Sequence, residues 1–203
     1  MRPRVIIILT EPQGYSPRAL DTLRRIGPVY PWQQARRDPR LAVRMSVLVV
    51  KLGMKISKAV MDRLPNLKII GTSTTGLNHI DTVEAVRRGI RIISLRGEAK
   101  FLRTITPTAE ETIGLLIMLV RNLPWGFDAV RRGRWDKEKF YGRELAGKTL
   151  GILGFGRLGS MVAGFAKALG MDVVACDPYV SSAAMRRAGA RKVSMDALFR
   201  QSD

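Results

Sequence analysis

The chain has 203 residues, 46% of them hydrophobic, which is enough apolar surface for one large core or two small ones. Its formal net charge of +18, from 35 Lys and Arg against 17 Asp and Glu, raises the question of nucleic-acid binding. The basic residues are spread along the whole chain and not gathered on one helix or tail. We therefore expect a solvated, Arg-rich surface and no nucleic-acid partner.

The composition also bears on location. Cys176 is the single cysteine, so no intramolecular disulfide can form, and we expect it to be a small core residue in a reducing cytosol. The apolar run near the N-terminus is too short for a secretory signal, and the run 113–120 is too short to cross a bilayer. These features predict a soluble, cytoplasmic protein with no membrane partner.

Strand-like and helical patterns alternate through the first half of the chain. Short apolar runs predict four strands, at 4–9, 46–51, 67–73 and 91–95. Helical patterns lie between them, at 16–27, 56–65 and 80–89. In the first of these, Ser16 is suited to the N-cap, Pro17 to the first turn and Gly27 to the end. The alternation predicts a parallel sheet with helices on both faces.

The pattern changes near residue 105, where we place the boundary between two domains, 1–105 and 106–203. Residues 105–123 predict one long helix, capped by Thr106 or Thr108. This helix is apolar nearly all round from Ile113 to Val120, so we expect it to be buried between domains or subunits.

The segment 124–148 that follows is polar, aromatic and irregular, and we interpret it as an arm or connector. A second alternating series comes after it. It predicts strands at 148–155, 171–177 and 191–194, and helices at 157–170, 181–190 and 195–203. We see no tandem repeat in either half.

The stretch GILGFGRLG carries the most specific chemical signal. Gly154, Gly156 and Gly159 have the G-x-G-x-x-G spacing, directly after a predicted strand and at the start of a predicted helix. In a dinucleotide-binding turn, the first glycine permits the tight turn and the second lets the pyrophosphate approach. The third lets the helix pack closely on the strand. Asp177 ends the next strand, where an acid binds the adenosine ribose hydroxyls.

An acid at this position favours NAD over NADP because it repels a 2′-phosphate. The next three residues, Pro178, Tyr179 and Val180, supply no cation to reverse that preference. The more distant Arg186 and Arg187 are the only hint of NADP. The alternative reading of the motif is a glycine turn in a domain that binds no nucleotide.

Four segments, in this order, resemble the D-isomer-specific 2-hydroxyacid dehydrogenases, a family that includes D-3-phosphoglycerate dehydrogenase: GTSTTGLNHIDTVEAVRRGI, TPTAEETIGLLIMLVRNL, GRELAGKTLGILGFGRLG and ALGMDVVACDPY. The resemblance implies an α/β protein with a flavodoxin-like substrate-binding domain, 1–105. It also implies a Rossmann NAD-binding domain, 106–203, a doubly wound parallel sheet that lacks its C-terminal half. The implied reaction transfers a hydride between NAD and a D-2-hydroxy acid or 2-oxo acid.

The resemblance also assigns roles to single residues. It implies that Lys51, Leu52, Gly53 and Gly76 bind substrate, with the loop amides and the lysine holding the carboxylate. Family members often have Arg-Ser in place of Lys51-Leu52, so the carboxylate geometry here can differ. The implied NAD contacts, besides the three glycines and Asp177, are Thr75, Thr108, Arg157 and Leu158. Each has a structural alternative: a solvated lysine at a strand end, a turn before a helix, or a helix cap.

The resemblance places the family's catalytic histidine, glutamate and arginine beyond the segments present here. We therefore assign no catalytic residue and no metal ligand within this chain. His79 is the only histidine, and we expect it to be structural or solvent-exposed, beside Asn78 and Asp81, which can cap the next helix. The chain is then expected to be a fragment or truncated frame, or to need a partner at its sheet edge.

Three functions remain open. The first is a dehydrogenase represented by its front part, with little or no turnover as this chain. The second is a non-catalytic, corepressor-like protein that senses NAD(H), and the third is a charge-driven nucleic-acid binder. By analogy we also expect a homodimer, through 107–141 and its aromatic residues: Trp125, Phe127, Trp135, Phe140 and Tyr141. In a monomer, the same residues would instead cover the cofactor domain.

Overall fold

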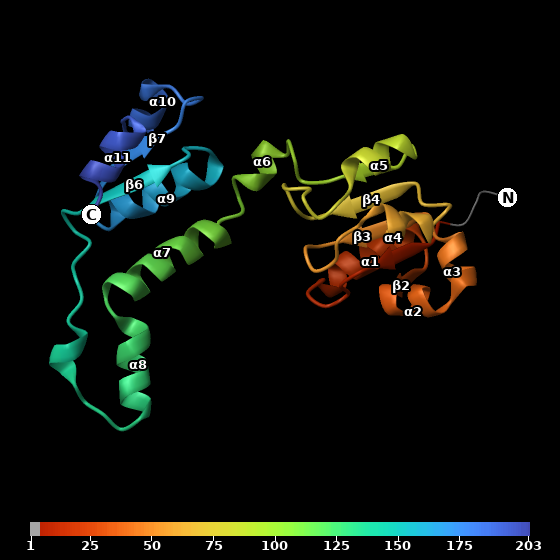
Figure 1. Cartoon of the computed structure of the whole chain (residues 1–203), viewed down its shortest axis with the longest axis horizontal. Helices are drawn as coiled ribbons and strands as arrows, with labels where there is room; N and C mark the ends of the chain where they lie inside the picture. The colour runs from red at the N-terminus through yellow and green to blue at the C-terminus, as the bar shows by residue number, and fades with distance from the viewer. Residues whose placement is uncertain (1–4) are drawn as a thin grey trace. The chain divides into compact units, whose positions relative to one another are not determined.

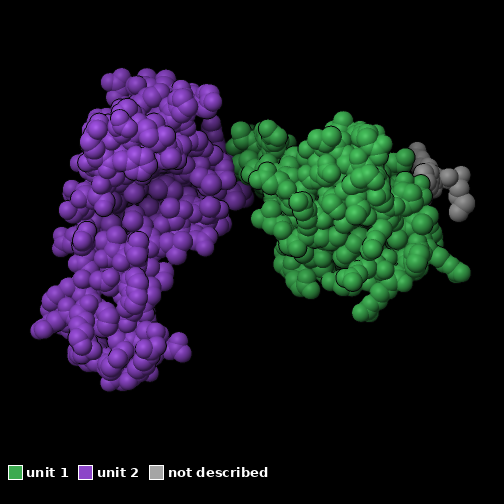
Figure 2. All heavy atoms as spheres, in the orientation of Figure 1, with its two compact units in different colours: residues 1–102 green, residues 103–203 purple. Residues whose placement is uncertain are grey.

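The structure is a computed structural model and describes residues 5–203 (Figure 1). The chain divides into two compact units, one ending at Leu102 and one comprising Arg103–Asp203 (Figure 2). Each unit is a parallel sheet with helices, so the predicted α/β fold class is confirmed.

The first unit is built on a five-stranded parallel sheet in the order β2-β1-β3-β4-β5. This is the strand order of flavodoxin-like folds, as predicted. The strands are β1 (Ile7–Leu9), β2 (Val29–Pro31), β3 (Val47–Val50), β4 (Ile69–Thr72) and β5 (Arg91–Ile93). Alternate residues on one face of neighbouring strands, such as Ile8, Leu48 and Ile70, are in register and fully buried in one core.

Six helices belong to this unit: α1 (Pro17–Ile26), α2 (Trp32–Arg37), α3 (Pro39–Arg44), α4 (Lys58–Asp62), α5 (Thr82–Arg87) and α6 (Ala99–Leu102). Ser16 caps α1 by accepting from the Ala19 amide, and Gly27 ends it, both as predicted. β2, α2, α3 and α6 were not predicted.

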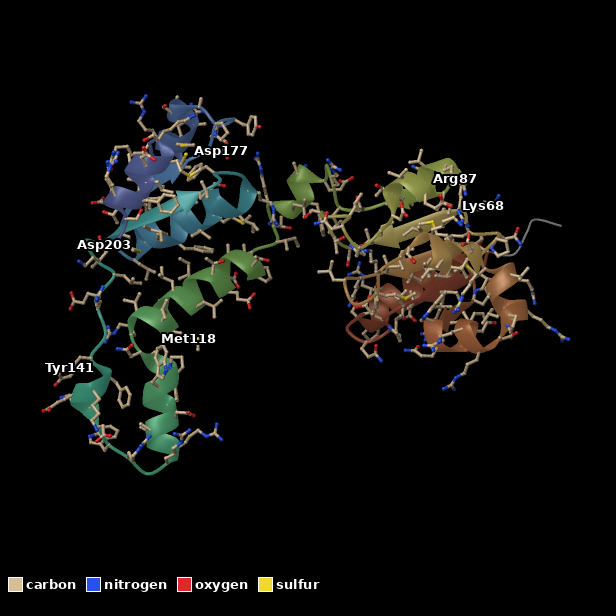
Figure 3. The ribbon with its side chains drawn as sticks, viewed as in Figure 1. Lys68, Arg87, Met118, Tyr141, Asp177 and Asp203 are labelled. Carbon is tan, nitrogen blue, oxygen red and sulfur yellow. The ribbon has the colours of Figure 1, made fainter. Side chains whose placement is uncertain are left out.

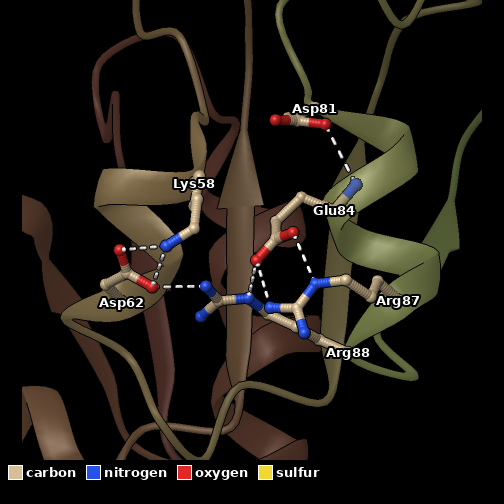
Figure 4. A network of polar contacts seen from close by, with 6 residues as sticks. All are labelled: Lys58, Asp62, Asp81, Glu84, Arg87 and Arg88. Atoms are coloured by element: carbon tan, nitrogen blue, oxygen red, sulfur yellow. Dashed lines mark hydrogen bonds and ion pairs between the residues drawn. The ribbon is translucent and has the colours of Figure 1, made fainter.

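An ion-pair network joins α4 and α5 on the surface of the first unit (Figure 4). Glu84 binds both Arg87 and Arg88, and Arg88 also reaches Asp62, which pairs with Lys58. The Arg87 and Arg88 guanidinium groups hold the pKa of Glu84 well below its usual range, at about 2. The network links two helices that lie 20 or more residues apart in sequence.

The second unit has a three-stranded parallel sheet, β6-β7-β8, with strands at Thr149–Leu153, Asp172–Cys176 and Arg191–Lys192. Its helices are α7 (Pro107–Val120), α8 (Leu123–Arg131), α9 (Arg157–Ala168), α10 (Ser182–Arg187) and α11 (Met195–Gln201), with a short 3₁₀ turn at Lys137–Phe140. α7, α9 and α10 pack with the sheet in one core around Ala109, Ala163 and Met185.

Two expectations for residues 105–148 are wrong. The single helix predicted over 105–123 ends at Val120, because Asn122 adopts a left-handed conformation (φ 53°) that starts a new helix, α8. About a third of the predicted irregular arm, residues 124–131, therefore belongs to α8. In the single chain Leu115 is 58% and Leu119 63% exposed. The burial of this helix between domains or subunits stays a prediction.

No single helix of the described residues has both the length and the hydropathy to cross a bilayer. Ala99–Val120 and Leu123–Arg131 meet that requirement only when taken together, and they are bent by 65° where they meet.

Candidate functional site

The glycine turn joins β6 to α9 at the carboxyl edge of the second sheet. Gly154 has φ +88°, a left-handed conformation that favours glycine, and its amide donates to the Cys176 carbonyl (2.9 Å). A Cβ on Gly159 would collide with the Gly154 carbonyl oxygen and press on Ile152. Gly154 thus permits the turn, and Gly159 lets α9 approach the strand, as the spacing predicts.

Gly156 has neither of these constraints. Its φ of −77° is open to any residue, and a Cβ there would meet no atom within 4 Å. The missing side chain therefore leaves free space outside the turn. The amides of Gly156, Leu158 and Gly159 donate to no group in the described part of the chain. Free amides at the start of a 12-residue helix form a site for an anion.

Asp177 directly follows β7 and is hydrogen-bonded to the glycine turn (Figure 3). Its Oδ2 accepts from the Phe155 amide and its Oδ1 from the Tyr179 amide, both at 2.8 Å. These two backbone bonds, Phe155 first, lower the pKa of Asp177, so the carboxylate is charged at neutral pH. Each carboxylate oxygen has a further lone pair for a ribose hydroxyl.

The structure also adds a cation near this acid. Lys192, on β8, contributes to the lowered pKa of Asp177 through its charge, and its Nζ donates to the Val180 carbonyl (2.7 Å). The expectation of no cation after Asp177 holds for the three residues that follow it in sequence. That expectation did not include Lys192, which lies on the neighbouring strand β8.

Arg157 and Leu158 directly follow the glycine turn, and Thr108 is near the start of α7. The Arg157 guanidinium donates to the Ile105 carbonyl (2.9 Å), which brings the segment before α7 beside the start of α9. Thr108 is exposed in the first turn of α7, and Leu158 is partly exposed in the first turn of α9. The Arg157 side chain is thus directed to Ile105, whereas the resemblance implied that it reaches the pyrophosphate.

The second unit fits the diphosphate of a dinucleotide. A helix N-terminus with free amides, open space at Gly156 and a charged acid bonded to the turn are the three features that such a group needs. Bound there, NAD would supply hydride-transfer chemistry. No three His, Cys, Asp or Glu side chains gather as a metal site among residues 5–203.

In the first unit, Thr75 and Gly76 line a pocket of about 620 Å³ after β4, together with Leu77, Asn78 and Arg96. The amides of Thr75, Gly76 and Leu77, like the Arg96 guanidinium, have no hydrogen-bond acceptor in the described residues. The residues that line this pocket include no acid. The pocket therefore combines several free donors with one cation, as an anion site requires.

Lys51, Leu52 and Gly53 form a separate loop after β3. The amides of Lys51 and Gly53 both donate to the Glu11 carboxylate at 2.9 Å. The Lys51 Nζ donates to the Gln13 carbonyl (3.2 Å) and lies 4.4 Å from the centre of the Tyr15 ring. Two of the amides that the resemblance assigns to a substrate carboxylate are thus bound to a carboxylate of the chain itself.

His79 lies in the turn between β4 and α5. Its Nε2 is 3.4 Å from the Thr72 hydroxyl, and its Nδ1 is buried with no partner among the described residues. Its carbonyl accepts from the Ile56 amide, and Asp81 caps α5 through the Glu84 amide. The surroundings are those of a structural histidine.

Sequence reasoning missed Glu11 and Arg96. Both lie within three residues of the end of a strand of the first sheet, β1 and β5, and the carboxyl ends of parallel strands are where ligands bind in such sheets. Their place near the ends of predicted strands was the one feature of the sequence that could have identified them. The loops that these residues contact are far away in sequence, so the contacts themselves were not visible.

Comparison with known proteins gives a consistent result. Residues 9–99 match the catalytic-domain model of the D-isomer specific 2-hydroxyacid dehydrogenases, and residues 113–203 match the NAD binding domain model of the same family.

Curated relatives are similar over much of the chain. The D-3-phosphoglycerate dehydrogenase of Archaeoglobus fulgidus is 35% identical over 200 residues, which cover 97% of this chain and 37% of that enzyme. The hydroxypyruvate reductase of Thermotoga maritima is 33% identical over 159 residues, which cover 78% of this chain and 49% of that enzyme. The chain thus spans less than half the length of either relative.

Solved structures share the fold. A D-lactate dehydrogenase from Aquifex aeolicus, complexed with NAD and lactic acid, has a TM-score of 0.79 at 24% identity. The similarity covers 98% of this chain and 58% of that one. A dehydrogenase from Rhizobium meliloti has a TM-score of 0.76 at 28% identity, over 97% of this chain and 67% of that one.

Proposed function

The chain belongs to the D-isomer-specific 2-hydroxyacid dehydrogenase family, and from this premise we propose that it carries the front part of an NAD-dependent oxidoreductase. The reaction would transfer a hydride between NAD and a D-2-hydroxy acid or its 2-oxo acid. The observation that carries the proposal is the bond from the Phe155 amide to Asp177, because it places a charged acid directly against an open glycine turn.

The cofactor of this family is NAD, and the second unit has the groups to hold it. We assign the pyrophosphate to the free amides of Gly156, Leu158 and Gly159, and the adenosine ribose to Asp177. A carboxylate with a lowered pKa disfavours a 2′-phosphate by charge repulsion. Lys192 opposes this effect in part, but its Nζ is already bound to the Val180 carbonyl.

For the substrate we propose the pocket at Thr75, Gly76 and Arg96. The free backbone amides would donate hydrogen bonds to the carboxylate of a 2-hydroxy acid, and the Arg96 guanidinium would balance its charge. The cofactor contact predicted for Thr75 and the substrate contact predicted for Gly76 belong to this proposal.

We propose that these 203 residues bind cofactor without turning over substrate at an appreciable rate. General acid–base catalysis in this reaction needs a group that can exchange a proton with the substrate hydroxyl. The one histidine, His79, faces Thr72 with its Nε2 and has a buried Nδ1, which suits a structural role.

We further propose that the chain pairs with a second copy through α7 and α8. Large apolar side chains on these helices are exposed in the isolated unit: Leu115, Met118, Leu119, Trp125 and Phe127. An exposed apolar surface of this kind is typical of an interface between proteins.

A titration of the chain with NADH, followed by NADH fluorescence, tests the cofactor proposal, and absence of saturable binding would refute it. A separate sample of the chain, without NADH, is then mixed with NAD and a series of D-2-hydroxy acids. We expect little NADH formation. A clear rate that is abolished by Asp177→Ala would show that the chain is catalytically complete and contradict the proposed lack of turnover.

A second function is favoured by the net charge of +18 and by the structural surroundings of His79. In this alternative the chain senses NAD(H) and binds an acidic protein partner. It would bind NADH without turnover, and its affinity for the partner would change when NADH is bound. An affinity that is the same with and without NADH would exclude it.

A further inference from the structure

The first unit holds one of its own carboxylates on main-chain amides at the carboxyl edge of its sheet. Glu11 follows β1, and its Oε2 accepts from the Lys51 amide at 2.9 Å and from the Thr10 hydroxyl at 3.1 Å. Its Oε1 accepts from the Gly53 amide, also at 2.9 Å. Thr10 is only 6% exposed, so this end of the carboxylate is fixed against the core.

Two amides of one short loop that converge on a carboxylate form an anion cradle, and hydrogen bonds to a charged acceptor are among the stronger ones in proteins. The cradle is shaped for Glu11. A Cβ on Gly53 would lie 2.5 Å from Oε1, so any side chain at this position would push the carboxylate out. The loop 51–53 therefore has a built anion site, and the chain itself supplies the anion.

The Lys51 side chain, the cation of this loop, also contacts the segment that carries Glu11. The Lys51 Nζ donates to the Gln13 carbonyl and lies over the Tyr15 ring, both in the segment between β1 and α1. Burial, and next the charge of Glu11, raise the pKa of Tyr15, as expected if a carboxylate faces its hydroxyl. Backbone and side chain of Lys51 are thus both turned toward the β1–α1 segment.

We propose that Glu11 is a specificity-determining residue that fills the 51–53 cradle from within and so directs the substrate carboxylate to the amides of Thr75–Leu77. This inference rests on the proposed function, since it takes the ligand to be a carboxylic acid. It reassigns Lys51 and Gly53 from direct contact with substrate to contact with Glu11. Glu11 acts on substrate only through the loop, so it is a positioning residue and not a catalytic one.

Mass action supports the assignment. A tethered group has an effective concentration on the order of millimolar even on a flexible linker, and a side chain packed in place exceeds that. A free carboxylate that displaced Glu11 would replace one carboxylate by another and gain no hydrogen bond. Dissolved acids at millimolar concentration therefore leave Glu11 in the cradle, whereas the amides of Thr75–Leu77 have no competing acceptor among residues 5–203.

The test is an amide ¹H–¹⁵N NMR titration of the full chain with acetate and with D-lactate. We expect the Thr75–Leu77 resonances to shift and those of Lys51 and Gly53 to stay in place. In Glu11→Ala the cradle is open, so the Lys51 and Gly53 resonances shift with acetate. Acetate also restores part of the melting temperature that the substitution removes, which a purely structural loss would not allow.

Shifts of Lys51 and Gly53 in the unsubstituted chain, at the concentrations that shift Thr75–Leu77, would overturn the inference. This titration decides the question even if Glu11→Ala does not fold. If neither loop shifts in the unsubstituted chain, the proposed substrate pocket fails. Acetate shifts in Glu11→Ala would then still support the cradle, so the two failures are distinguishable.

Discussion

The three glycines of the β6–α9 turn have three different physical reasons to be glycine. Gly154 needs a left-handed backbone, and Gly159 has no room for a Cβ. Gly156 has an ordinary backbone, and a Cβ there would meet no atom of the described residues within 4 Å. The proposed diphosphate gives a reason for glycine at this position, because it approaches the backbone closely.

This difference predicts that Gly156→Val separates cofactor binding from stability. The substitution has room in the folded chain, and valine is only a poorer N-cap for α9 than glycine, so we expect no more than a small drop in melting temperature. The side chain would occupy the place of the diphosphate, and we expect the Kd for NADH to rise at least about tenfold, or ~1.4 kcal/mol. Calorimetric titration and thermal unfolding measure the two effects.

Gly164→Val is the matched control, because a Cβ on Gly164, within α9, also meets no atom within 4 Å. Valine forms helix slightly better than glycine, so neither stability nor NADH affinity should fall. Equal NADH affinity in both variants and in the original chain would mean that the diphosphate does not lie at Gly156.

At the residue scale, the sequence predicted what depends on local spacing. The positions of Gly154, Gly159 and Asp177 follow from one strand, one turn and the next strand. Glu11 and Arg96 could not be predicted, because their roles depend on which distant loops meet at the edge of the first sheet. Glu11 and Lys51 are separated by 40 positions in sequence, and no pattern between them marks their contact.

The junction of α7 and α8 shows how one residue overrides a helical pattern. The predicted helix runs to residue 123, but Asn122 adopts φ 53° and its side chain donates to the Tyr141 carbonyl (3.0 Å). Asparagine tolerates this conformation better than other non-glycine residues. Sequence reasoning placed the end of the helix at residue 123, whereas α7 ends at Val120.

The left-handed conformation predicts an inverted order of stability at position 122. Asn122→Gly and Asn122→Ala both lose the bond to Tyr141, so their difference reports the backbone alone. Glycine has no Cβ penalty in this conformation, and we expect Asn122→Ala to be the less stable variant by about 1–2 kcal/mol in urea unfolding. In a continuous helix alanine would be favoured by ~1 kcal/mol, so that order would contradict the break.

The α4–α5 network predicts a change of stability in acid. The folded-state pKa of Glu84 is about 2, below its unfolded value of about 4.3, so the charged form is favoured in the folded chain. This contribution is complete above the unfolded pKa. It is lost as the pH falls through about 4 toward about 2 (Figure 4).

Glu84→Gln removes the titrating group but keeps the size of the side chain. We expect its melting temperature to be lower than that of the original chain at neutral pH, and to fall less steeply between about pH 5 and about pH 2. Parallel pH profiles for the two proteins would show that the network does not couple protonation to folding.

At the scale of the whole molecule, two properties favour contact with other molecules. The charge of +18 is spread over the chain, and the exposed apolar residues of α7 and α8 lie on neighbouring helices. The α/β class and the repeated alternation of strands and helices were predictable because they depend only on hydrophobic periodicity. The exposure of the apolar helix was not, because its pattern is the same whether the chain or a second copy covers it.

If α7 and α8 form a dimer interface, Leu119→Glu should convert a dimer into a monomer in sedimentation analysis. Leu119 is 63% exposed in its unit, so the substitution costs the isolated unit little. Val83→Glu is the control, since Val83 on α5 is 81% exposed and lies outside the proposed interface. An original chain that is monomeric at micromolar concentration would contradict the proposed pairing.

A comparison of NADH and NADPH affinity, each titrated into the full chain by calorimetry, tests the central claim most directly. If an open glycine turn and a charged Asp177 hold the cofactor, NADH should bind at least about tenfold tighter than NADPH, and Asp177→Asn should reduce that ratio. Equal affinities, or a ratio unchanged by Asp177→Asn, would show that this acid does not face the ribose.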